Sequence, residues 1–142
     1  MKRWNGWGDD QNDLGMELNR SALAYLRQLI GPATALPDAT LEQVLASVPP
    51  SRLPPQALVS LDPEDRLRHA RGQSLPDWLA LRSGEFGVFP DGVAFPKCAA
   101  EVQELLRYAQ QHDVSLIPYG GGTSVVGHIN PEAGERPVLT VD

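Results

Sequence analysis

Hydrophobic positions in the first third of the chain recur at three- and four-residue spacings, as on one face of a helix. We predict a helix over Leu14–Ile30, ended by Gly31 and Pro32, and a shorter one over Thr40–Val48, ended by Pro49. The longer helix shows the spacing at Leu14, Leu18, Ala22, Tyr25, Leu26 and Leu29. Residues 49–57 are rich in proline and predict a semi-rigid connector.

Two further helices are predicted from their capping residues. Asp62 precedes Pro63 and two acids, which favours a helix start, and we expect this helix to run to Arg71 and end at Gly72. Ser74 and Asp77 form a capping pair for another short helix that reaches about Leu81.

After Gly84 the pattern changes to short apolar runs around one amphipathic helix. Gly92–Pro96, Val114–Ile117 and Val138–Val141 are predicted strands, and Glu101–His112 is a predicted helix. Cys98 stands at the cap position of that helix, where we expect a structural role. The order β-α-β-loop-β is typical of a nucleotide-binding half-domain.

These elements predict an α+β fold in two parts, with a helical and proline-rich extension over residues 1–85 and a β-α-β unit over residues 86–142. The chain ends directly after its last strand, which we expect to lie at the edge of an incomplete sheet with unpaired backbone groups. On this ground we expect the chain to be the N-terminal part of a longer protein.

Composition narrows the functional class. The chain of 142 residues carries 18 acids and 12 bases, a net charge of −6, which argues against nucleic-acid partners and anionic membrane surfaces. One cysteine permits no internal disulfide, and there is no long apolar run or signal peptide, so we expect a cytoplasmic protein without a transmembrane segment.

The most specific motif is the run Pro118-Tyr119-Gly120-Gly121-Gly122-Thr123-Ser124 after an apolar strand. Glycines reach positive φ at low cost, so we expect several backbone N–H groups to turn inward and form an anion-binding nest. The run lacks the lysine of a phosphate-binding P-loop and the spacing of a dinucleotide fingerprint. A phosphate cradle and a plain structural turn therefore both remain open on the residues alone.

Other chemistry is sparse. His69, His112 and His128 are far apart in sequence, and no Cys/His cluster has metal-ligand spacing, so no metal site is predicted. His112 ends a helix, where a cation meets the negative end of the dipole, and we expect a structural role for it. His128 follows the glycine run and is the histidine we consider for a site role.

These residues resemble a known family. The glycine run and Asp91–Pro96 are similar to the first part of the FAD-binding (PCMH-type) domain of vanillyl-alcohol-oxidase-type flavoproteins. Residues 70–74, residues 81–84 and the opening Trp4–Gly8 sharpen the resemblance to the alkylglycerone phosphate synthase family. The resemblance is clear over residues 66–142 and looser before them.

The resemblance implies FAD as cofactor, with its pyrophosphate along the glycine run. The implied contacts are Pro118, Tyr119, Gly120, Gly121, Gly122, Thr123 and Ser124, with Val125, Gly127 and His128 near them. Many relatives attach FAD covalently through a histidine, but Thr123 stands at that position here, so non-covalent FAD is implied. No catalytic residue is assigned, because the family's substrate chemistry lies in parts expected after residue 142.

The family's reaction exchanges the acyl group of an acylated dihydroxyacetone phosphate for a fatty alcohol, without net redox, in ether-lipid synthesis. The resemblance thus implies a small-molecule or lipid substrate, and a homodimer is one expected assembly of the full-length form. One alternative is an FAD-linked D-lactate or glycolate dehydrogenase or oxidase of the same fold. A second is a non-catalytic truncated product, and we expect the 142-residue chain alone to retain FAD weakly or not at all.

Overall fold

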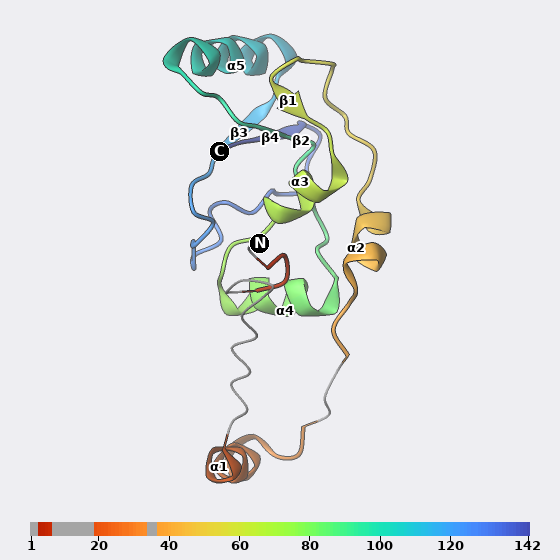
Figure 1. The fold of residues 1–142 in the computed structure, drawn as a ribbon, viewed down its shortest axis with the longest axis vertical. Coiled ribbons are helices and arrows are strands. Elements are labelled where there is room, and N and C mark those ends of the chain that lie inside the picture. The colour runs from red at the N-terminus through yellow and green to blue at the C-terminus, as the bar shows by residue number, and fades with distance from the viewer. Residues whose placement is uncertain (1–2, 7–18, 34–36) are drawn as a thin grey trace.

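The computed structural model describes residues 3–6, 19–33 and 37–142, which form helices and a small mixed sheet (Figure 1). The helices are α1 (Arg20–Ile30), α2 (Leu41–Ser47), α3 (Pro63–Arg68), α4 (Leu75–Ser83) and α5 (Ala99–His112). The strands are β1 (Val59–Ser60), β2 (Gly92–Ala94), β3 (Ser115–Pro118) and β4 (Val138–Val141). The predicted α+β class and the β-α-β-loop-β order of the second half are confirmed.

The sheet has the order β1-β2-β4-β3, so the last strand of the chain lies inside it. β4 runs parallel to β2 on one side and to β3 on the other, whereas β1 is antiparallel to β2. The expectation that the final strand lies at an open edge is therefore wrong. The crossover through α5 places β3 beyond the position that β4 fills, so β4 finds partners on both sides.

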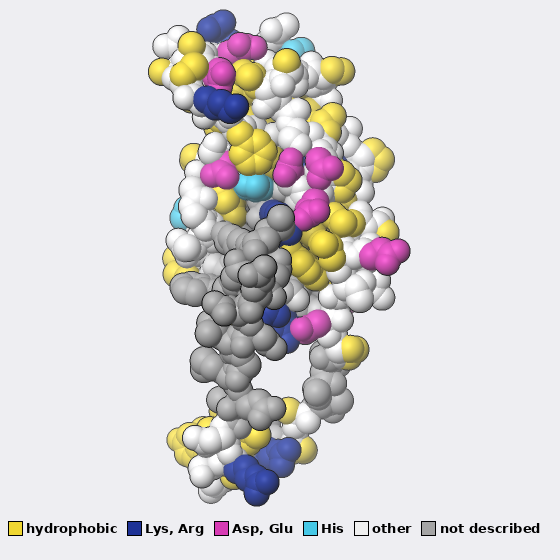
Figure 2. Space-filling model, viewed as in Figure 1, with side chains coloured by type: hydrophobic (Ala, Val, Ile, Leu, Met, Phe, Trp, Pro, Cys, Tyr) yellow, Lys and Arg dark blue, Asp and Glu magenta, His cyan; other side chains and the backbone are white. Residues whose placement is uncertain are grey.

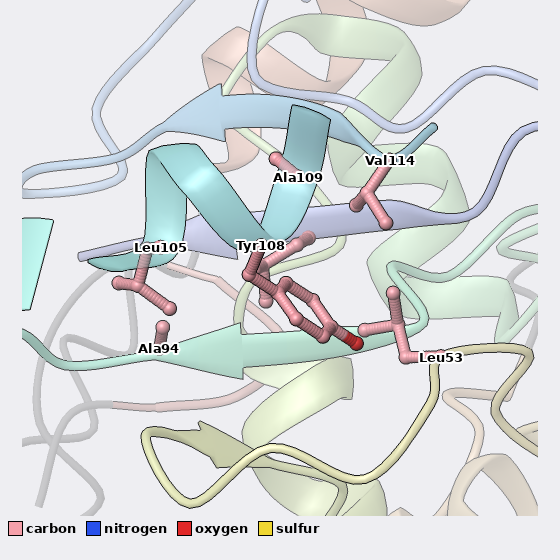
Figure 3. Packing of buried hydrophobic residues seen from close by; sticks show 7 residues of the cluster. Leu53, Ala94, Leu105, Tyr108, Ala109 and Val114 are labelled. Carbon is pink, nitrogen blue, oxygen red and sulfur yellow. The ribbon is translucent and has the colours of Figure 1, made fainter. Parts of the chain in front are cut away.

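Helix α5 covers one face of this sheet and builds the first of two hydrophobic clusters (Figure 3). Leu105, Tyr108 and Ala109 of the helix lie against Ala94 of β2 and Leu53 of the connector. The hydroxyl of Tyr108 donates to the carbonyl of Pro54 at 2.7 Å, so its polar end is satisfied. This packing fixes the crossover helix, and hence the position at which β3 begins.

The second cluster joins α2, α3 and α4. Its buried members are Val44, Leu67, Ala70, Leu81, Phe86 and Phe89, and Trp4 packs against them. The rings of Phe86 and Phe89 stack with centroids 5.1 Å apart. Trp4–Gly6 form a bend, while Trp7 and Gly8 of the opening motif lie outside the described residues.

The predicted parts 1–85 and 86–142 contribute jointly to these elements. β1 and Leu53 join the sheet and its cluster, and Phe86 and Phe89 join the helical cluster. β1 was not predicted, because two residues beside a proline-rich stretch give no strand periodicity. The division of the chain into two domains stays a prediction.

Arg52 and Asp91 link the proline-rich connector to the start of β4. The carboxylate of Asp91 accepts from Arg52 Nε and Nη2 at 2.9 and 2.8 Å and from the backbone N–H of Val138 at 2.8 Å. Burial alone raises the pKa of Asp91, but these hydrogen bonds and the Arg52 charge outweigh it and lower the pKa below its ordinary value. Asp91 therefore holds β4 in register as an anion.

Helix α3 ends earlier than predicted, at Arg68 instead of Arg71. His69 leaves the helix with φ −110°, and its Nδ1 lies 2.6 Å from the carbonyl oxygen of Asp65. The following residues instead form a loop that contacts the glycine run, as described below. α4 begins after the predicted Ser74–Asp77 capping box and ends at Gly84, which is left-handed with φ +79°.

Helix α1 begins at Arg20 rather than Leu14, because Asn19 is extended and its side chain caps the helix by accepting from the N–H of Ala22. Leu14 and Leu18 lie outside the described residues. α1 lies at one end of the molecule, away from the sheet, and none of its residues is buried (Figure 1). Figure 2 shows hydrophobic and basic side chains together at that end.

The remaining predicted elements are confirmed with small shifts at their ends. α5 begins two residues before Glu101, and Cys98 is its N-cap but makes no side-chain capping bond. The Cys98 thiol is free and exposed. His112 ends α5 and packs against the ring of Tyr108, 4.9 Å away between centroids.

Candidate cofactor-binding site

The glycine run lies at the carboxyl end of β3. Pro118 pairs with Val141 of β4, and the N–H of Tyr119 donates to the carbonyl of Val141 at 2.8 Å. From Gly120 onward the chain leaves the sheet as an irregular loop. In parallel sheets the crevice beyond the carboxyl ends of the strands is where ligands bind, so the run has the expected position for a binding loop.

The loop amides are available for a ligand. The N–H groups of Gly120, Gly122 and Thr123 donate no hydrogen bond to any residue that the structure describes. Gly120 is exposed, and a Cβ added there would meet no atom within 4 Å. The loop is therefore neither locked into sheet pairing nor filled by side chains at this point.

Of the three glycines in the run, one adopts positive φ. Gly122 has φ +69°, whereas Gly120 and Gly121 are not left-handed. The left-handed residue, Gly122, is also buried. At positions 120 and 121 the chain itself therefore requires glycine neither for backbone conformation nor for space, because an added Cβ would meet no atom within 4 Å at Gly120 and only the Thr123 side chain at 3.7 Å at Gly121.

A second loop, residues 68–74, lies against the glycine run and supports it. The hydroxyl of Tyr119 donates to the carbonyl of Arg68 at 3.1 Å, and the N–H of Gln73 donates to the carbonyl of Ser124 at 2.6 Å. A Cβ on Gly72 would lie 2.4 Å from that same Ser124 oxygen. The two loops approach so closely that only glycine fits at position 72.

Buried polar side chains anchor this pair of loops to α4. Asp77 is 2% exposed and accepts from Asn130 Nδ2 at 2.6 Å and from both the N–H and the hydroxyl of Ser74. Asn130 Oδ1 in turn accepts from the N–H of Gly72 at 3.1 Å. Each buried polar atom of this network has a partner, which favours one fixed arrangement of the loops.

A pocket of about 500 Å³ opens beside Gly120, at the carboxyl ends of β3 and β4. His69 and Asp142 meet in its wall, with Nε2 and Oδ2 3.2 Å apart, and the rings of His69 and Tyr119 lie 4.5 Å apart. Burial raises the pKa of Tyr119, and the Asp142 carboxylate raises it further. Figure 2 shows acidic side chains and a histidine gathered on this face of the molecule.

The ten residues predicted to contact the cofactor fall into two groups. Pro118, Tyr119, Gly120, Gly121, Gly122, Thr123 and Ser124 form one continuous loop, of which Tyr119 and Gly120 line the 500 Å³ pocket. Val125 and Gly127 line a second hollow of about 570 Å³ on the α4 side, and His128 lines a third of about 390 Å³ beside β3. The Nδ1 of His128 lies 3.0 Å from the hydroxyl of Ser124, so His128 contacts the end of the run.

Sequence reasoning did not select several residues that build this region. His69 and Asp142 meet only because α3 and the end of β4 converge, and 73 residues separate them in sequence. Asp77 was expected as a helix cap, but its contact with Asn130 spans 53 residues. Arg71 lines both the 500 Å³ pocket beside Gly120 and the hollow beside α4. The glycine at position 72 was the local signal that a second chain segment comes close.

Comparison with known families finds one matching profile. The family described as "FAD binding domain" matches residues 90–139, which include β2, α5, β3 and the glycine loop. The match therefore spans the part of the fold that presents the available amides.

Comparison with curated proteins extends the likeness to the whole chain. Alkyldihydroxyacetonephosphate synthase of Dictyostelium discoideum is 29% identical over 99% of this chain, and that of Caenorhabditis elegans is 25% identical over 99%. The chain is similar to alkyldihydroxyacetonephosphate synthase over its whole length. It spans 28% of the length of each of these two relatives.

Solved structures give the same result. One structure of alkyldihydroxyacetonephosphate synthase superposes with a TM-score of 0.77 at 26% identity, covering 99% of this chain and 32% of that one. The α+β fold with its small sheet is thus the fold found in part of that enzyme. A shorter likeness covers 32% of this chain, at 41% identity, to a mitochondrial D-lactate dehydrogenase (cytochrome) of Arabidopsis thaliana.

Two further observations concern the described residues only. They contain no helix long and apolar enough to cross a bilayer. They also contain no group of three or more His, Cys, Asp or Glu side chains arranged to hold a metal ion.

Proposed function

We propose that the loop Pro118–Ser124 binds the diphosphate bridge of FAD through its backbone, with Val125, Gly127 and His128 at its edge. The observation that carries this proposal is that the N–H groups of Gly120, Gly122 and Thr123 have no hydrogen-bond partner among the described residues, and that Gly120 lies beside open space. Backbone amides that converge at the carboxyl edge of a parallel sheet suit a phosphate group. The FAD-binding profile over residues 90–139 supports FAD as the nucleotide.

The cofactor is held without a covalent bond at this loop. Thr123 occupies the position at which covalently flavinylated relatives carry histidine, and a threonine hydroxyl does not form that bond. When bound, FAD supplies the reactive flavin ring, and residues 118–124 contribute binding and orientation.

The full activity requires more chain than these residues, since the chain spans 28% of the relatives it matches. We propose that the complete protein is an alkyldihydroxyacetonephosphate synthase, which exchanges the acyl chain of an acylated dihydroxyacetone phosphate for a fatty alcohol while the fatty acid leaves. The present residues supply part of the FAD site to that enzyme. A cytoplasmic location and a homodimer belong to the same proposal.

The alternative is an FAD-linked 2-hydroxyacid dehydrogenase. The likeness to D-lactate dehydrogenase favours it over one third of the chain only. The two activities are separated by giving the protein, with its complete flanking sequence, either D-lactate and an electron-accepting dye or acyl-dihydroxyacetone phosphate and hexadecanol. Dye reduction favours the dehydrogenase, and an ether-linked product without dye reduction favours the synthase.

The binding proposal is tested by equilibrium dialysis of the chain against FAD and against riboflavin, which has no phosphate. We expect weak binding of FAD and tenfold or more weaker binding of riboflavin, because only FAD offers a diphosphate to the loop. Equal affinity for the two ligands would contradict the assignment of the loop to the diphosphate.

A further inference from the structure

Arg71 occupies the second loop, next to the point at which that loop touches the glycine run. It lines both the 500 Å³ pocket beside Gly120 and the hollow that Val125 and Gly127 line. Its guanidinium lies against the backbone of Gly87, where an added Cβ would be 3.7 Å from Nη2. Arg71 thus stands between two openings that flank the glycine loop.

The Arg71 side chain is half-buried, and its Nε is fully buried without a hydrogen-bond partner among the described residues. Four other arginines in the described part of the chain have protein acceptors, although Arg66 Nη2 is also buried without a partner. Arg52 pairs with Asp91, Arg82 with Asp38 and Arg136 with Asp113, and Arg66 donates to two backbone carbonyls. A buried charged donor without an acceptor destabilises the folded protein. A ligand that supplies an acceptor would therefore gain binding free energy from this contact.

The charge of Asp77 acts on Arg71, but both Asp77 oxygens already accept hydrogen bonds from other residues. Oδ1 accepts from Asn130, and Oδ2 accepts twice from Ser74. Burial lowers the pKa of Arg71, and the charge of Asp77 raises it only in part. The described residues therefore leave the charge of Arg71 without full compensation, and Arg71 lines both hollows.

We propose that Arg71 is a ligand-binding residue that pairs with a phosphate of the diphosphate held by the glycine loop. The proposal rests on the function proposed above. It adds a cationic side chain to a site for which the sequence analysis expected backbone N–H groups as the anion-binding groups. A guanidinium can donate two parallel N–H bonds to one phosphate, which a lysine cannot do. The ligand class is a nucleoside or inorganic diphosphate, with FAD as the natural example.

The test compares Arg71→Gln with Arg71→Lys and with Arg107→Gln, a matched loss of charge at an exposed position of α5. Affinity for inorganic pyrophosphate, ADP, FAD and riboflavin is measured on each chain by NMR titration. We expect Arg71→Gln to weaken binding of the three phosphate ligands about tenfold, Arg71→Lys to restore part of it, and Arg107→Gln to change nothing. Riboflavin binding should be the same in all four proteins.

Stability provides a second readout that separates ligand binding from a structural role. Because Arg71 Nε is unpartnered, Arg71→Gln should leave the free energy of unfolding unchanged or raise it. Loss of stability together with equal loss of riboflavin binding would overturn the proposal in favour of a structural arginine.

The two proposals fail differently. If the wild type binds FAD at the glycine loop and Arg71→Gln binds it equally well, the role of Arg71 is refuted and the loop assignment stands. If no diphosphate ligand perturbs the loop of the wild type, the proposed function itself fails, and the role of Arg71 fails with it.

Discussion

The backbone N–H of Gln73 donates a 2.6 Å hydrogen bond to the carbonyl oxygen of Ser124. This bond joins the loop after α3 to the end of the glycine run, 51 residues later in the sequence. The shape of the glycine loop therefore depends on a segment that contains none of its residues. Changes in residues 68–74 should alter cofactor binding even where they touch no ligand.

Gly72→Ala should damage the site through this contact. The added Cβ would lie 2.4 Å from the backbone oxygen of Ser124, so one of the two loops must move. We expect a loss of about 1–3 kcal/mol in the free energy of unfolding and a clear loss of FAD affinity. Urea unfolding and dialysis measure the two effects.

Gly134→Ala is the control for this change, because a Cβ there meets no atom within 4 Å. It should leave both stability and FAD binding as they are. If Gly72→Ala behaved like Gly134→Ala, the close approach of the two loops would be wrong.

Gly120→Ala and Gly122→Ala should distinguish the effect of a methyl group in the proposed ligand space from the effect of backbone strain. At Gly122 φ is +69°, so alanine should cost about 1 kcal/mol of stability and distort the loop. At Gly120 alanine meets open space and no strain, so stability should stay while FAD affinity falls, because the methyl group enters the place assigned to phosphate. Equal stability losses in thermal unfolding of both variants would contradict this account.

Asp91→Asn should change how stability depends on pH. The folded-state pKa of Asp91 is lowered, so its contribution is present above the unfolded pKa of about 4 and is lost as the pH falls through the folded value. The asparagine variant should be less stable at pH 7 by about 1–3 kcal/mol, because Arg52 and the N–H of Val138 lose a charged acceptor.

Urea unfolding of both proteins between pH 7 and pH 2.5 tests this expectation. The wild type should lose stability over the acidic part of the range, and the difference between the two proteins should shrink as the pH falls. A difference that stays constant down to pH 2.5 would show that Asp91 is not held as an anion.

The proposal that FAD binds without a covalent bond is tested by acid precipitation of protein loaded with FAD. If the proposed role of Thr123 holds, all yellow colour should remain in the supernatant. Flavin in the washed protein pellet would mean that another residue of the protein forms the bond.

Local signals in the sequence were sufficient to predict several individual helices and strands, but not the order of the strands in the sheet. The apolar strands, the amphipathic face of α5 and the capping box of α4 each depend on residues within a few positions of one another, and each was predicted. The predicted end of α3 was wrong because His69 and the loop after it make contacts outside the helix that a local sequence pattern does not show. The central place of β4 was also missed, since strand order depends on the α5 crossover.

The candidate site was predictable from the sequence only in part. The glycine run marks the loop, and its position after an apolar strand marks the edge of the sheet. The supporting residues Gly72, Asp77 and Asn130 could not be grouped from the sequence, because their contacts span more than fifty residues. The φ values of Gly120 and Gly121 could not be read from residue type, because glycine permits both signs.

The most direct measurement is a ¹⁵N–¹H NMR titration of the chain with FAD, with ADP as a second diphosphate and riboflavin as control. The account predicts that FAD and ADP shift the amide signals of Gly120, Gly122 and Thr123 at low millimolar concentration or below, and that riboflavin does not. If saturating FAD and ADP left these three amides in place, or shifted only amides elsewhere, the loop would not be the diphosphate site.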